Sequence, residues 1–100
     1  MVKLAILAHV EAKPGKEDAV ARFFSNALPL VEAEPRTVAW FGFRTGPSTF
    51  AIFDTFDDEA GRDAHLNGEV AKALMAVADD LFARPPVIQK ADLLGVKMPG

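Results

Sequence analysis

The sequence contains no cysteine, so it cannot form a disulfide framework, a thiolate nucleophile or a cysteine-ligated metal centre. It also lacks clustered positive charge, because its 11 Lys and Arg are scattered among 14 Asp and Glu, and its formal net charge is -3. Binding to a phosphate backbone or to an anionic membrane surface needs basic clusters. Neither nucleic acid nor a membrane surface is therefore an expected partner.

Long apolar runs, repeats and low-complexity linkers are absent as well. No apolar run reaches the roughly 18 residues that span a bilayer. The opening stretch mixes aliphatic residues with lysine, histidine and glutamate, unlike a secretory leader, so a cytoplasmic location is expected. With nothing to divide it, the chain is predicted to form a single domain over residues 1–100.

Apolar residues at every second position predict the strands, and apolar residues at helical spacing predict the helices. The predicted strands are 2–10, 37–44, 49–56 and 87–97. One helix is predicted to start near Glu17 and to end before Pro35, with a kink or a break into two short helices near 26–28 because of Pro29.

A second helical region is predicted between the last two strands. Asp57 is its expected N-cap, Asn67-Gly68 is expected to stop or bend it before it resumes, and Arg84-Pro85-Pro86 is expected to end it. The resulting order is strand, helix, strand, strand, helix, strand. This order predicts the ferredoxin-like α+β fold, an antiparallel sheet with its helices on one face.

The central hairpin is apolar on both faces, whereas a single antiparallel sheet usually keeps one face exposed to water. Phe41 and Phe43 lie on one side of the first hairpin strand, whereas Phe50 and Ile52 share the alternate side of its partner. A second covering layer is therefore expected. The economical source is a second copy of the chain, in a homodimer that packs sheet against sheet.

Five segments occur in an order and spacing similar to those of the antibiotic biosynthesis monooxygenase domain family, whose members are dimeric α+β barrel proteins. The segments are VEAKPGKED, EAEP, WFGFR, FAIFDTF and DDEAGRDAHL. The resemblance covers nearly the whole chain. It implies a homodimer that needs no cofactor and oxygenates quinol- or anthrone-like aromatics in an apolar pocket between helices and sheet. The family also includes haem-degrading members and proteins with no established activity.

His65 is the candidate catalytic residue, and the resemblance places it on the pocket-lining helix. Cofactor-free oxygenation needs a base that removes a phenolic or carbon-bound proton, and a histidine titrating near neutral pH suits this task. The alternative is a half-exposed histidine bonded to solvent or to a carbonyl. His9 is expected to be a solvent-touching residue at a strand end.

Four further residues are candidates for substrate binding. Trp40 and Arg44 share a strand face, where an aromatic wall and a cationic anchor suit a planar anionic ligand, although packing and ion pairing are alternatives. Asp54, a charge within an apolar strand, is predicted to pair with Arg44, to be exposed, or to act as a pocket acid. Asn67 either orients a substrate oxygen or serves only as a bend.

Three functions remain open: a cofactor-independent monooxygenase, a module that binds a small aromatic ligand without turnover, and a structural dimer with a filled core. Two distant histidines without metal-ligand spacing predict no metal site. Fold resemblance alone does not choose among these functions.

Overall fold

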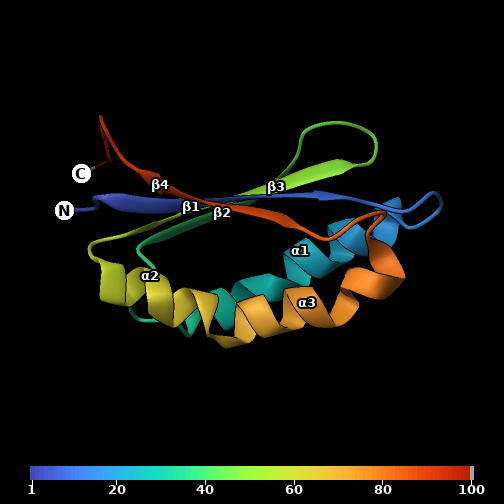
Figure 1. Cartoon of the computed structure of the whole chain (residues 1–100), viewed down its shortest axis with the longest axis horizontal. Helices are drawn as coiled ribbons and strands as arrows, with labels where there is room; N and C mark the ends of the chain where they lie inside the picture. Colours follow the sequence, from blue (N-terminus) through green and yellow to red (C-terminus); the bar gives the residue numbers. More distant parts are fainter. Residues whose placement is uncertain (100) are drawn as a thin grey trace.

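The computed structural model describes residues 1–99, which form one sheet and one layer of helices (Figure 1). In chain order the elements are β1 (Leu4–Glu11), α1 (Glu17–Glu32), β2 (Ala39–Arg44), β3 (Thr49–Phe56), α2 (Glu59–Leu66), α3 (Glu69–Leu81) and β4 (Val87–Asp92). The strands are antiparallel in the order β2-β3-β1-β4, and the helices lie against one face. The predicted ferredoxin-like fold is confirmed.

The even-numbered residues of β1, β2 and β3 face the helices, as the period of two predicts. They meet the apolar stripes of α1 and α3 in the core, whose buried members are Ala8, Val10, Ala12, Val20, Phe24, Phe50, Ile52, Leu74 and Phe82. Trp40 and Phe23 pack against this cluster from its side. The core therefore sits between α1, α3 and the middle of the sheet.

Helix α1 is continuous from Glu17 to Glu32, so the predicted break near residues 26–28 is wrong. Pro29 lies in the last turn, and its carbonyl still accepts a hydrogen bond from Ala33 N–H at 3.2 Å. The hydrogen bond that proline cannot donate would have gone to Ser25, which is exposed, so water can satisfy that carbonyl. A proline this close to the helix end therefore costs little.

Helix α2 begins one residue later than predicted. Asp58, and not Asp57, is its N-cap: the Asp58 carboxylate accepts a hydrogen bond from Gly61 N–H at 2.8 Å. The same carboxylate holds the Arg36 guanidinium at 2.8 and 2.9 Å, which ties the segment after α1 to the start of α2. The predicted stop at Asn67-Gly68 is confirmed, since α2 ends at Leu66 and α3 starts at Glu69.

The strand limits differ from the predicted ones mainly at the free ends. β2 starts at Ala39 rather than at 37, and β4 ends at Asp92 rather than at 97, opposite Leu4 at the start of β1. Beyond Asp92 a single hydrogen bond joins Leu93 N–H to the Lys3 carbonyl. β4 ends there because β1 offers it no further partner.

The sheet face away from the helices is not covered by any other described element of the single chain (Figure 1), and it exposes large apolar side chains. Phe41 is 58% exposed, Phe43 42% and Val87 50%. The predicted two-faced apolar hairpin is therefore present. No helix of residues 1–99 is long and apolar enough to cross a membrane.

Candidate functional site

His65 lies near the end of α2 and is held between two carboxylates. Its Nε2 is 2.8 Å from Asp54 Oδ2 on β3, and its Nδ1 is 2.6 Å from Glu34 Oε1, just beyond α1. Thr37 Oγ1 donates a hydrogen bond to Glu34 Oε1 at 2.9 Å. One imidazole ring thus joins the sheet, α2 and the segment that follows α1.

The surroundings of His65 favour its charged form. Burial lowers its pKa, but the hydrogen bonding and negative charge of Asp54, followed by those of Glu34, raise it more, so the pKa lies above the ordinary 6.5. Asp54 is fully buried. Asp54 Oδ2 lies 2.8 Å from Nε2, and because both side chains are buried, water screens the attraction of their charges little.

His65 also lines a cavity of about 350 Å³ between the end of α1 and the α2–α3 junction. Glu34 and Thr37 join it there, and the remaining walls are mostly small or apolar: Leu30, Ala33, Pro35, Arg36, Gly61, Ala64, Gly68 and Glu69. We call this the histidine cavity. Both histidine nitrogens face carboxylates, so neither is free to contact a ligand there.

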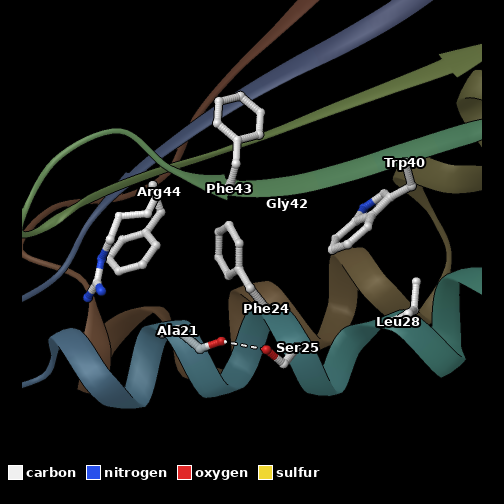
Figure 2. Close-up of a pocket in the computed structure, with 9 residues that line it drawn as sticks. Ala21, Phe24, Ser25, Leu28, Trp40, Gly42, Phe43 and Arg44 are labelled. Carbon is white, nitrogen blue, oxygen red and sulfur yellow. Dashed lines mark hydrogen bonds between the residues drawn. The ribbon is translucent and has the colours of Figure 1, made fainter.

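A second cavity, of about 380 Å³, lies between α1 and strands β2 and β3 (Figure 2). We call it the aromatic cavity. Its lining residues are Ala21, Phe24, Ser25, Leu28, Trp40, Gly42, Phe43, Arg44 and Phe50. The Arg44 guanidinium carbon lies 4.8 Å from the centre of the Phe50 ring, a cation–π distance.

The absence of a side chain at Gly42 leaves space for two rings of this cavity, those of Trp40 and Phe24. A Cβ at this position would come within 2.8 Å of Trp40 Cη2 and 3.0 Å of Phe24 Cδ2, closer than side-chain atoms approach. The indole and the phenyl ring therefore lie directly against the β2 backbone (Figure 2).

The structure separates the predicted site residues into two groups. Trp40 and Arg44 line the aromatic cavity, whereas His65 lines the histidine cavity. Asn67 lines neither: it is exposed and its side-chain amide donates to the Asp63 carbonyl at 2.8 Å, so it ends α2. Asp54 is the link, because it contacts His65 and sits opposite Trp40 on the paired strand.

The predicted pairing of Asp54 with Arg44 is wrong. The hairpin register places Arg44 opposite Phe50. It places Asp54 opposite Trp40, which precedes Arg44 by four residues on β2. Asp54 is also not exposed: it is fully buried, pairs with His65 and lines neither cavity. His9 is exposed on β1, as predicted.

Glu34 and Thr37 were not identified from the sequence, although they complete the histidine cluster. Glu34 does carry one signal: it is an acid just past the C-terminal end of α1, where the helix dipole disfavours negative charge. Such a placement suggests a positive partner elsewhere in the fold. Within residues 1–99, no three His, Cys, Asp or Glu side chains are arranged to hold a metal ion.

Comparison with solved structures gives the class of fold first. An antibiotic biosynthesis monooxygenase structure is 20% identical, with a TM-score of 0.78 over 92% of this chain and 99% of that one. A protein from Mycobacterium tuberculosis is 14% identical, with a TM-score of 0.84 over 96% and 99%. The chain thus shares the fold of the antibiotic biosynthesis monooxygenases.

A much closer relative is a protein of unknown function from Nitrosomonas europaea. It is 56% identical, has a TM-score of 0.97, and the match covers 100% of this chain and 97% of that one. The chain belongs to the same family as this protein. No family model matches the chain, and neither does any curated protein.

The raised pKa of His65 predicts a specific pH dependence of stability. Because the folded pKa is above 6.5, the ion pairs stabilise the protein fully below that pH, and this contribution is lost as pH rises through the folded value. The unfolding free energy of wild type should therefore exceed that of His65→Gln most at about pH 6, and by less at about pH 9. Urea unfolding measures both. His9→Gln is the control and should follow wild type; a constant His65→Gln difference would contradict the prediction.

A methyl group at position 42 should disturb the aromatic cavity. We expect Gly42→Ala to displace the Trp40 and Phe24 rings and to cost about 1–3 kcal/mol of stability through overpacking. Trp40 is the chain's one tryptophan, so its fluorescence reports the displacement directly. Gly95→Ala, where a Cβ meets nothing within 4 Å, is the control. An unchanged emission spectrum and unfolding midpoint in Gly42→Ala would refute the predicted crowding.

Proposed function

We propose that this protein is a cofactor-independent monooxygenase of a small planar phenol or anthrone. The observation that carries the proposal is the aromatic cavity, where the rings of Phe24, Trp40 and Phe50 surround a space of about 380 Å³ and the Arg44 cation stands at its edge. A mostly apolar cavity with few polar groups is typical of sites for small organic ligands. The 20% identical structure, an antibiotic biosynthesis monooxygenase, suggests the reaction class.

The reaction uses dioxygen as its only co-substrate. Loss of a proton gives an electron-rich anion, which reduces dioxygen and forms a carbon–oxygen bond; loss of water then leaves a carbonyl, so that a CH₂ group and O₂ become C=O and H₂O. Arg44 can stabilise the negative charge that develops on the substrate oxygen.

His65 is the base predicted from the sequence, but its surroundings restrict that role. Both of its nitrogens face carboxylates, which favour its charged form, so it can accept a proton only in its neutral form, and it lines the histidine cavity rather than the aromatic cavity. This pairing also favours the second candidate function, a module that binds the same class of ligand without turnover. In that case the histidine cluster serves stability alone.

Oxygen uptake separates the two functions. Wild type, with a chelator present and no added flavin, should consume oxygen with one or more of hydroquinone, 1,4-dihydroxynaphthalene and anthrone. Arg44→Gln should lower kcat/KM by about tenfold to a hundredfold, the usual range for a lost charge-assisted contact. Arg22→Gln, an exposed arginine of α1 outside the cavity lining, is the control. Binding without uptake of oxygen would favour the module; equal rates in Arg44→Gln would exclude that residue from the site.

We also propose that the uncovered sheet face packs against a second copy of the chain. The face exposes Phe41 and Phe43, which lie on the same side of β2. Exposed aromatic patches of this kind are characteristic of interfaces. A twofold arrangement covers both copies with one self-complementary contact.

Light scattering at micromolar concentration tests the dimer. Wild type should have twice the chain mass, and Phe41→Glu should shift it to the monomer by placing a charge in the apolar contact. Met75→Glu, an equally exposed apolar residue on α3 at 56% exposure, is the matched control and should remain dimeric. A monomeric wild type would leave the apolar outer face without an explanation.

A further inference from the structure

The positive charge at the edge of the aromatic cavity has no acidic partner in the described chain. Arg44 is exposed and lines the cavity, and no carboxylate of residues 1–99 forms an ion pair with it. Three other arginines do have such a partner: Arg36 with Asp58, Arg62 with Glu59 and Arg84 with Glu11. The charge of Arg44 is therefore available to a ligand.

The Phe50 ring holds the Arg44 side chain in place. The two residues are opposite in the β2–β3 register, and the guanidinium carbon lies 4.8 Å from the ring centre. A phenyl ring attracts the cation but has no oxygen or nitrogen to accept its hydrogen bonds, so the N–H donors stay available. Figure 2 shows the guanidinium at one end of the cavity and the Trp40 indole at the other.

The rest of the cavity lining offers a ligand mainly apolar surface. Trp40 presents only its ring, because its Nε1 is shielded from solvent. The Ser25 hydroxyl donates to the Ala21 carbonyl at 3.3 Å (Figure 2). Among the described residues, no acid and no second cation line this cavity. A ligand there meets aromatic rings and a single positive charge at one end.

One available cation favours a ligand that carries one full negative charge. Carboxyl groups lose their proton near about pH 4, whereas phenols do so only near about pH 10, so at neutral pH the carboxylic acid alone is ionised. The fork of guanidinium N–H groups matches the two oxygens of a carboxylate. A phosphate monoester carries nearly two charges, and the lining has no second cation to balance them.

We propose that the substrate class of the aromatic cavity is a planar aromatic carboxylate. Its carboxylate pairs with Arg44, and its rings lie against Phe24, Phe50 and Trp40. This assignment rests on the proposed function, because it takes the aromatic cavity as the ligand site. A guanidinium has five N–H donors, so a carboxylate that takes two of them leaves others for an adjacent substrate oxygen on which charge develops.

A matched pair of ligands tests the carboxylate separately from turnover. 2-Naphthoate and 2-naphthamide have the same rings and nearly the same shape, but only the first is charged, and neither has the hydroxyl that the proposed oxygenation needs. In titration calorimetry at neutral pH and low salt, wild type should bind the carboxylate about tenfold more tightly, the effect of one charge-assisted pair. Arg44→Gln should reduce this preference to less than about twofold, and Arg44→Lys, which keeps the charge without the fork, should fall between the two. Arg22→Gln, on the exposed side of α1, is the control and should keep the wild-type preference.

Salt and a doubly charged ligand extend the test. Because Arg44 is exposed, its substitutions should leave the fold intact, which circular dichroism verifies, and added salt should narrow the preference for the carboxylate. 2-Naphthyl phosphate should bind no more tightly than 2-naphthoate; tighter binding would overturn the choice of a carboxylate. Equal affinity of wild type for naphthoate and naphthamide, or an unchanged preference in Arg44→Gln, would overturn recognition by Arg44 and leave the cavity as a ligand site. Binding of neither ligand would overturn the cavity itself, and oxygen uptake with the phenol panel reports independently on the proposed reaction.

Discussion

The ion pairs of His65 with Asp54 and Glu34 are the interaction that joins β3, α2 and the segment after α1. A fully buried carboxylate such as Asp54 is strongly unfavourable unless an opposite charge accompanies it. His65 supplies that charge from α2, and Glu34 keeps the ring protonated from the other side. Because the three residues come from β3, α2 and the segment after α1, loss of His65 would leave two carboxylates without their positive partner. The same cluster therefore fixes how α2 docks and where the Asp54 carboxylate points in the core.

The aromatic cavity depends on a different constraint, the absence of a side chain at Gly42. The Trp40 and Phe24 rings occupy the volume that a Cβ would need, so the cavity wall is set by the β2 backbone itself. Trp40 is shared between the two regions: it lines the aromatic cavity and lies opposite Asp54 in the sheet. The hairpin register is thus what brings an aromatic wall and a buried acid to one place.

Much of the fold could be predicted from the sequence because its signals are local. Period-two apolar runs and the Asn67-Gly68 bend identify the strands and the division of the second helical region. The site was less predictable because it depends on pairing. Arg44 and Asp54 lie on the same face of the sheet, but in the observed pairing Asp54 is opposite Trp40, four residues away from Arg44. The turn geometry sets this register, and it cannot be predicted from Gly46-Pro47 alone. Glu34 meets His65 across 31 positions of sequence, a contact that depends on how the segment after α1 lies against α2 in the folded chain.

The charges around the two cavities also restrict what orientation a ligand can take. Asp54, Glu34 and a protonated His65 leave a net negative charge beside the inner side of Trp40, whereas Arg44 brings positive charge to the cavity edge. An ionised oxygen of a ligand in the aromatic cavity is therefore attracted toward Arg44 at the cavity edge and repelled from the buried carboxylates beyond Trp40.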